Sequence, residues 1–222
     1  MQPLLARNLK RTIKAGKLAL TPLPLCPAIS LYLISDDYPT GRLPQDEMLA
    51  IIDKPAYWAF CWASGQVLAG YISQHPEICR GKSVLDLGSG SGVVAIAAAQ
   101  AGATSVIACD IDAHALDATR VNAKQNNVEV MLLTDLAQQQ RKVDMLIAAD
   151  VLYDQENLAW LDVLQNYAHE VLIADSRIRD QTVFSDYEMV EQITATTIPD
   201  LDELKEYGHV SIYHRRYSGT SD

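Results

Sequence analysis

The sequence lacks any apolar run long enough to span a membrane. A spanning helix needs about 18 or more consecutive apolar residues, and no segment of the 222 residues reaches that length. The chain also lacks a CxxC pair, and two of its four cysteines, Cys61 and Cys109, lie within apolar segments. Closely spaced cysteines are typical of metal sites and of small secreted disulfide scaffolds. We therefore expect reduced, packed thiols, an intracellular protein with no membrane span, and no structural metal.

Basic residues are scarce as well. The chain has 18 Lys and Arg against 28 Asp and Glu, and its formal net charge is -10. Proteins that bind the nucleic-acid backbone present a basic face, so we expect no nucleic-acid partner. The charge favours a cationic partner or simple solubility. The first twenty residues are an exception, because they hold five basic residues and no acid, a composition that also suits an organellar transit peptide.

Short apolar segments rich in branched residues alternate with helical segments from Val84 onward. This alternation is typical of βαβ units around a parallel sheet. Two strand-like segments near the C-terminus have no clear helix between them, and we expect them to form a hairpin-like pair beside the parallel strands. We predict one α/β domain over residues 1–222, Rossmann-like, with a mostly parallel sheet, an antiparallel C-terminal strand and helices on both faces. The predicted strands are SVLDLG, SVIACD, VEVMLL, VDMLIAAD, EVLIAD, EMVEQIT and HVSIYHRR.

Local signals place two of the helices. Ser64 precedes GQVLAGYISQ and is a favoured residue type for a helix N-cap, so we expect it to begin a helix over that segment. The segment ENLAWLDVLQNYA has apolar residues on one helical stripe, which predicts a helix packed on the sheet. The residues of that stripe are Leu158, Leu161, Leu164 and Ala168.

A glycine-rich turn, VLDLGSGSG at Val84 to Gly92, follows the first of these strands. In such a turn the backbone amides can approach a ligand at the carboxyl edge of the sheet. The dinucleotide fingerprint would need a glycine where this chain has Val93. Asp86 lies at the entrance of the turn, where its charge would oppose a pyrophosphate and favour an ammonium or sulfonium group. The turn therefore predicts a ligand with positive charge nearby.

Acids also end the next two strands. Asp110 can accept both hydroxyls of a ribose, as the equivalent acid does in dinucleotide folds, and Asp135 can receive the amino group of an adenine stacked near Ile111. S-adenosylmethionine satisfies these requirements together, because it carries a sulfonium, a ribose and an adenine. The alternative is that these acids only cap the helices that follow them, since Asp is a favoured N-cap.

Four segments resemble a known enzyme family: PAYWAFCWASGQVLAGYI, DLGSGSGVVAIAAA, CDIDAHAL and DVLYD. From about Lys82 onward the chain resembles the seven-strand S-adenosylmethionine-dependent methyltransferases. More narrowly, it resembles the electron transfer flavoprotein β-subunit lysine methyltransferases. In the wider group of protein lysine methyltransferases an acid, two variable residues and an aromatic follow the fourth strand. Here that acid is Asp150, which ends an otherwise apolar strand, and the aromatic is Tyr153.

The resemblance implies roles for particular residues. It places Asp150 and Tyr153 on the substrate side and a family tryptophan, Trp62, near the cofactor, although Trp62 would serve equally well as an aromatic core anchor. The basic N-terminal stretch also resembles the opening segment of the family. The resemblance therefore implies that residues 1–80 are a native extension packed on a catalytic core of residues 81–222. It also implies a protein of the bacterial cytoplasm. The cofactor residues that it implies are Asp86, Gly88, Ser89, Gly90, Gly92, Asp110, Ile111 and Asp135.

Methyl transfer to lysine needs the amine in its neutral form. With a reference pKa of about 10.4, roughly one lysine in a thousand is neutral near pH 7.4, a handicap of about 4 kcal/mol. A carboxylate at Asp150 attracts and orients the ammonium but stabilises its charged form, so we expect Asp150 to orient the nitrogen and relay its proton to water. We expect Tyr153 to wall the channel with an aromatic face that tolerates cations.

Other activities remain open at this point. The expected partner is a lysine-bearing protein such as the electron transfer flavoprotein β subunit, but a ribosomal protein or a small amine would suit the same chemistry. A nicotinamide-dependent oxidoreductase and a binding module without turnover are alternatives of other classes. Asp175, Ser176 and Arg177 follow the fifth strand and are further candidates for substrate contact, or simply a surface loop. We expect a monomer.

Overall fold

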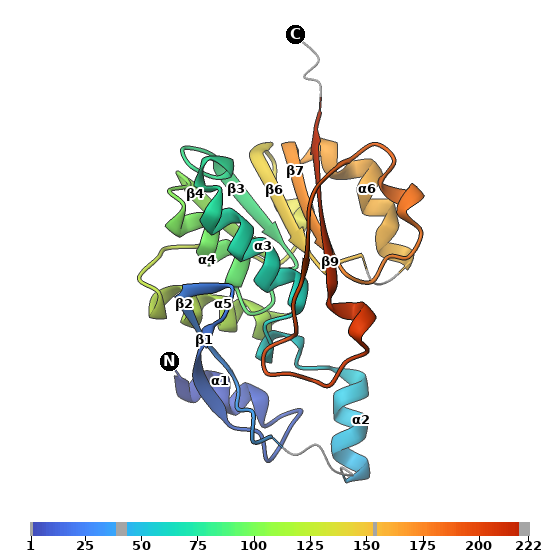
Figure 1. Ribbon diagram of the computed structural model, residues 1–222. Coiled ribbons are helices and arrows are strands. Elements are labelled where there is room, and N and C mark those ends of the chain that lie inside the picture. The colour runs from blue at the N-terminus through green and yellow to red at the C-terminus, as the bar shows by residue number, and fades with distance from the viewer. Residues whose placement is uncertain (1, 39–43, 153–154, 218–222) are drawn as a thin grey trace.

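The computed structural model describes residues 2–38, 44–152 and 155–217. Its centre is a seven-stranded sheet with strand order β5-β4-β3-β6-β7-β9-β8 (Figure 1). The first five strands in that order are parallel, whereas β9 is antiparallel to both β7 and β8. This confirms the predicted fold class. The strands are β3 (Ser83–Leu87), β4 (Ser105–Cys109), β5 (Met131–Leu133), β6 (Val143–Ala149), β7 (Ala168–Asp175), β8 (Glu188–Thr194) and β9 (His209–Arg216).

The middle of the sheet is buried on both faces. β6 and β7 pair in parallel with Leu146 opposite Val171, and both side chains are fully buried. Their near-continuous apolar runs are what a parallel strand covered on both faces requires. Successive residues of β6 belong to different clusters, with Met145 and Ile147 in one and Leu146 and Ala148 in the other. The sheet therefore separates two hydrophobic cores.

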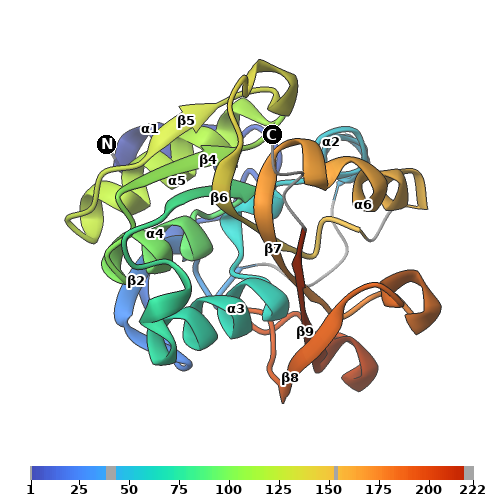
Figure 2. The same cartoon turned by 90° about the horizontal axis from the view of Figure 1, so that it is seen from above.

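Helices cover both faces of the sheet (Figure 2). On one face α3 (Ala63–Gln74) packs on α4 (Val93–Gln100), and α4 contacts α5 (Ala113–Gln125). On the other face lie the short helix α6 (Trp160–Val163) and its flanking 3-10 turns η4 (Gln155–Ala159) and η5 (Leu164–Asn166).

The prediction of a single helix over ENLAWLDVLQNYA is wrong, although the predicted packing on the sheet is observed. Leu158, Leu161 and Leu164 do pack on the sheet, but only four residues are α-helical, and Ala168 already begins β7. A hydrogen bond connects the start of this segment to the residues after β6: Asn157 Nδ2 donates to the carbonyl of Val151 at 2.8 Å.

The N-terminal residues form a layer that packs against α5. Helix α1 (Gln2–Leu9) and the hairpin β1 (Leu18–Leu23) and β2 (Cys26–Ile34) precede helix α2 (Gln45–Asp53). Asn122 of α5 accepts a hydrogen bond from the Tyr32 amide at 2.8 Å and donates one to the Ser91 carbonyl at 2.8 Å. This asparagine therefore connects the hairpin to the glycine-rich turn.

All four cysteines, Cys26, Cys61, Cys79 and Cys109, are buried and free. Desolvation raises the pKa of each thiol, to about 12 for Cys26 and Cys79 and to about 11 for Cys109. A thiol that stays protonated is a poor nucleophile, so the four cysteines act as small apolar residues of the core. Among the described residues, no helix is both long and apolar enough to cross a membrane.

Candidate active site

The glycine-rich turn needs its glycines for two reasons. Gly88, Gly90 and Gly92 have φ angles of 72°, 51° and 85°, in the left-handed region that side chains other than glycine rarely adopt. A Cβ atom at position 92 would also lie 2.9 Å from the Cα atom of Thr119 in α5. The neighbouring Ser89 is buried, and its hydroxyl pairs with that of Thr119 at 3.2 Å. The turn is therefore held close to α5 by its own backbone.

Asp86 lies below this turn and is 1% exposed. Its Oδ2 atom accepts a hydrogen bond from the Ala95 amide, in the first turn of α4, at 3.0 Å. Burial raises the pKa of Asp86 to about 7, and the Ala95 hydrogen bond opposes that shift. At neutral pH a nearby cation would favour the ionised form. The site therefore suits a ligand that brings positive charge, as the sequence predicts.

Asp110 ties the end of β4 to the glycine-rich turn. Its Oδ2 atom accepts a hydrogen bond from the Gly90 amide, and its Oδ1 atom accepts one from the Asp112 amide, both at 2.9 Å. Desolvation raises its pKa. The adjacent Ile111 is 94% exposed, so its side chain is available to cover a flat ligand bound beside the turn.

Asp135 makes the bond expected of a helix cap. Its Oδ1 atom accepts a hydrogen bond from the Ala137 amide at 2.8 Å, and the 3-10 turn η3 (Leu136–Gln138) begins directly after it. The contact to adenine stays a prediction.

Asp150 has an unusual backbone and a specific set of hydrogen-bond donors. Its φ angle is 51°, a left-handed conformation that is uncommon for a residue other than glycine and is concentrated at functional sites. Its Oδ1 atom accepts hydrogen bonds from Ser64 Oγ at 2.6 Å, from Ser176 Oγ at 3.1 Å and from the Ser176 amide at 3.3 Å. Desolvation raises the pKa of Asp150, while the bonds from Ser64 and Ser176 lower it. Tyr153 lies outside the described residues.

The structure brings the glycine-rich turn and Asp150 together. A Cβ atom at Gly88 would lie 2.4 Å from the Cγ1 atom of Val151, the residue after Asp150. This contact follows from the topology, because β3 and β6 are parallel neighbours and their carboxyl ends meet at one edge of the sheet. A ligand bound at the turn and a group bound by Asp150 are therefore close neighbours.

The role predicted for Ser64 is wrong. Helix α3 begins at Ala63, so Ser64 lies inside the helix, and its hydroxyl donates to Asp150 instead of capping the backbone. The other hydroxyl that donates to Asp150 belongs to Ser176, which follows β7 and which the sequence indicates only as a candidate for substrate contact or a surface loop residue. Nothing local in the sequence indicates that α3 passes over the end of β6, which is what places Ser64 there.

Trp62 lies beside the loop that follows β7. Its indole Nε1 atom donates to the Tyr57 carbonyl at 3.1 Å, and the guanidinium of Arg177 lies 5.7 Å from its ring centroid. Arg177 in turn binds Glu203 at 2.6 Å. These contacts place the tryptophan near the loop after β7, and its contact with a cofactor stays a prediction.

Comparisons with known proteins point to one enzyme class. The family model described as "Ribosomal protein L11 methyltransferase (PrmA)" matches residues 72–196. The chain is 37% identical over 160 residues to the electron transfer flavoprotein β-subunit lysine methyltransferase of Mus musculus, an alignment that covers 68% of this chain and 63% of the mouse protein. It is 34% identical over 210 residues to the Danio rerio protein of the same name, covering 89% of this chain and 79% of that protein. The chain thus spans less than two thirds of the mouse relative and more than two thirds of the fish relative.

Solved structures with this fold include methyltransferases. Magnesium protoporphyrin IX methyltransferase from Synechocystis, solved with bound S-adenosylmethionine, superposes with a TM-score of 0.56 over 82% of this chain and 88% of its own. Only 18% of the aligned residues are identical, so the likeness concerns the fold alone.

Proposed function

The chain belongs to the electron transfer flavoprotein β-subunit lysine methyltransferase family of S-adenosylmethionine-dependent methyltransferases, and from that premise we propose that it methylates lysine side chains of a protein. One observation carries the proposal. The cofactor-type glycine turn packs at Gly88 against Val151, the residue that directly follows the acceptor-type Asp150. Methyl transfer is an in-line displacement that depends mainly on aligning two reactants, and this proximity supports the proposal that both bind at one edge of the sheet.

The residues around the turn fit S-adenosylmethionine, which supplies the methyl group on its sulfonium. Asp86 offers a buried negative charge, the amide-lined turn approaches closely, and Asp110 offers carboxylate oxygens for ribose hydroxyls. Ile111 is free to cover the adenine. Gly90 and Ser89 complete the turn. Asp135 and Trp62 belong to the proposal as outer contacts.

Asp150 is proposed to hold the acceptor amine. All the hydrogen bonds that its carboxylate accepts from the described residues go to Oδ1, which leaves Oδ2 to accept from an ammonium group. The carboxylate orients the nitrogen, and desolvation together with the nearby sulfonium charge favours loss of its proton. We propose that Tyr153 forms the aromatic wall of this channel.

The proposed substrate is an electron transfer flavoprotein β subunit, the protein named in the relatives. A ribosomal protein is the second candidate, because the matching family model is described as a ribosomal protein L11 methyltransferase. We also propose that residues 1–222 form one domain that acts as a monomer in the bacterial cytoplasm.

Transfer of radiolabelled methyl groups tests the proposal. The purified protein is incubated with labelled S-adenosylmethionine and either the electron transfer flavoprotein β subunit or ribosomal protein L11, and mass spectrometry identifies the modified residue. We expect label on a lysine of the flavoprotein subunit. Label on neither protein, together with calorimetric binding of a nicotinamide cofactor in place of S-adenosylmethionine, would contradict the proposal.

A further inference from the structure

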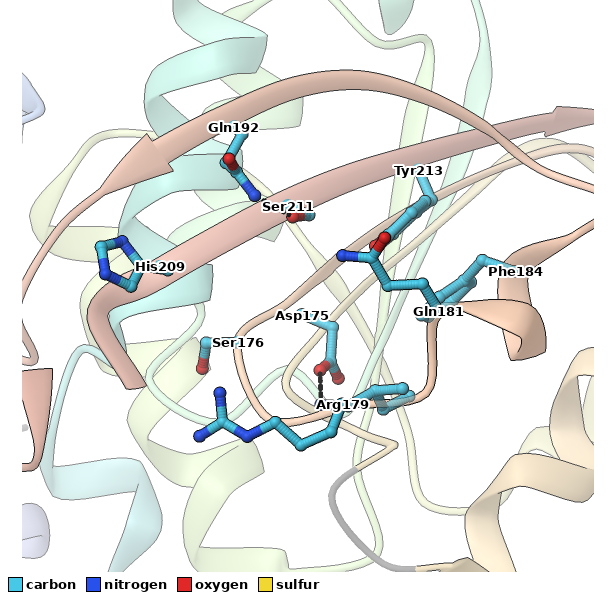
Figure 3. Close-up of a pocket in the computed structure, with 10 residues that line it drawn as sticks. Asp175, Ser176, Arg179, Gln181, Phe184, Gln192, His209, Ser211 and Tyr213 are labelled. Carbon is cyan, nitrogen blue, oxygen red and sulfur yellow. Dashed lines mark hydrogen bonds between the residues drawn. The ribbon is translucent and has the colours of Figure 1, made fainter. Parts of the chain in front are cut away.

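A cavity lies at the same edge of the sheet, on the side of Asp150 that faces away from the glycine-rich turn. Its volume is about 180 Å³. Figure 3 shows residues of the loop after β7 on one side and residues of β8 and β9 on the other. The residues that line it include Asp175, Ser176, Arg179, Gln192, Ser211 and Tyr213.

Asp175 gives this cavity an unsatisfied buried carboxylate oxygen. The residue is 5% exposed. Its Oδ1 atom accepts hydrogen bonds from the amides of Arg177 and Ile178, both at 2.7 Å. Its Oδ2 atom is buried and has no hydrogen-bond partner among the described residues. Buried polar atoms in native proteins are nearly always paired, so this oxygen is an open acceptor position for a donor from outside the described residues.

The two basic side chains that line the cavity are already engaged. Arg179 binds Glu206 at 2.9 Å, and its guanidinium lies 5.3 Å from the ring centroid of Tyr207. The Nδ1 atom of His209 pairs with the hydroxyl of Thr194 at 3.1 Å. Because the cation of Arg179 is neutralised, the charge that remains uncompensated in the lining is that of Asp175. The cavity therefore favours a cationic donor over an anion.

The strand order separates this cavity from the site of methyl transfer. Neighbouring strands lie about 4.8 Å apart, so Asp175, at the end of β7, is roughly 10 Å from β3, two strands away in the sheet. A group in the cavity is too far from the glycine-rich turn to be the acceptor. Asp150 directly follows β6, the strand next to β7, and Ala149 pairs with Ala174, so Asp175 is roughly 5 Å from Asp150.

We propose that the Asp175 cavity binds a second ammonium or guanidinium group of the protein substrate, while Asp150 holds the acceptor nitrogen. The enzyme would then select acceptor lysines that have another basic side chain close by, roughly 5 Å away. The net charge of -10 supports a basic substrate surface. This inference rests on the proposed function, because it concerns the substrate of that same reaction.

The first test measures binding without turnover. n-Butylammonium chloride and its neutral counterpart 1-butanol are titrated into the protein, and the backbone amide resonances of Gln192 and Ser211 are followed by NMR. We expect saturable shifts with the ammonium only. They should disappear in Asp175→Asn and persist in the matched control Asp162→Asn, a change of the same charge on the exposed face of α6. Shifts that do not saturate, or that persist in Asp175→Asn, would overturn the inference.

Asp175→Asn should preserve the local fold, because its amide oxygen can still accept from Arg177 and Ile178. A second variant, Gln192→Lys, changes an exposed position of β8 and leaves Asp175 in place, so it tests the cavity without altering a buried residue. Its lysine supplies an ammonium group from within the chain. It should occupy the cavity and suppress the same butylammonium shifts at Ser211.

The second test uses a methylated protein substrate. Each Lys and Arg near the modified lysine is replaced by Gln, and the kinetics of wild type, Asp175→Asn and Asp162→Asn are compared. We expect Asp175→Asn to raise KM about 10-fold with nearly unchanged kcat, and to have no further effect on the one substrate variant that lacks the partner base. An equal increase of KM for every substrate variant, or none at all, would refute the second subsite. Failure of wild type to methylate any protein would instead refute the proposed function. The NMR titration would still show whether the cavity binds an ammonium group.

Discussion

At the scale of single residues, the chemistry depends on the charge of Asp150. We predict that Asp150→Asn lowers kcat by about 100-fold or more, because an amide cannot attract the ammonium or take part in moving its proton. The dissociation constant for S-adenosylmethionine should change by no more than about twofold, since Asp150 lies outside the glycine-rich turn. Single-turnover kinetics and calorimetry measure the two quantities. Loss of both in parallel would contradict the assigned role.

Ser64 tunes the same carboxylate. Its hydrogen bond at 2.6 Å lowers the pKa of Asp150, which burial raises. Ser64→Ala removes that bond, so the pKa of Asp150 should rise further and the acid limb of the kcat/KM profile should move to higher pH. Ser73→Ala, which removes a hydroxyl that donates to the Ala69 carbonyl within the same helix, is the matched control. An unchanged acid limb in Ser64→Ala would show that Asp150 does not titrate in catalysis.

The sequence predicts the acidic residues of this site better than the residues that donate hydrogen bonds to them. Asp110 and Asp150 each directly follow a strand, and Asp86 is the last residue but one of β3, and such positions are readable because the apolar run stops there. Ser64 and Ser176 come from other elements and meet Asp150 only after folding. A hydroxyl inside a helix has no local signal for such a role.

At the scale of secondary-structure elements, the glycine-rich turn and α5 are packed too closely for a side chain. Gly81 and Gly92 have similar φ angles of 75° and 85°, but a Cβ atom at position 81 meets nothing within 4 Å, whereas one at position 92 meets the backbone of Thr119. We predict that Gly81→Ala costs about 1 kcal/mol of unfolding free energy from backbone strain. Gly92→Ala should cost about 2–5 kcal/mol, because overpacking adds to that strain. Urea denaturation measures both, and equal losses would contradict the contact.

Elements differ in how well the sequence predicts them. All seven strands of the main sheet were predicted within a few residues, because branched apolar runs separated by polar segments specify buried strands. The hairpin of β1 and β2 was missed. Its residues alternate poorly, and it is held by side chains of α5 such as Asn122, which are distant in sequence. The segment around α6 was predicted as one helix because its leucines fit a helical stripe, which the 3-10 turns also satisfy.

At the scale of the whole molecule, buried acids make stability depend on pH. Burial raises the pKa of Asp86 to about 7 and that of Asp175 to about 6, above the value of about 3.9 in an unfolded chain. The folded protein therefore binds more protons than the unfolded chain between these values, and stability from these groups is lost as pH rises through them.

Asp86→Asn isolates the larger contribution. We predict that between about pH 5 and pH 7 the unfolding free energy of wild type falls about 2–3 kcal/mol more than that of the variant. Affinity of wild type for S-adenosylmethionine should increase over the same range, because the sulfonium favours ionised Asp86. Denaturation and calorimetry across pH measure these changes. Parallel stability curves for the two proteins would show that Asp86 is not responsible.

Because all four thiols are buried, the rate at which they react with a thiol reagent reports how often the protein opens. Cys26 lies in β2, Cys61 in the segment before α3, Cys79 in the segment before β3, and Cys109 in β4, so together they sample the hairpin layer and the centre of the sheet. A maleimide dye should label the native chain only as fast as these regions open. Mass spectra of partly labelled samples would then reveal whether the hairpin layer separates before the sheet or the whole chain opens at once.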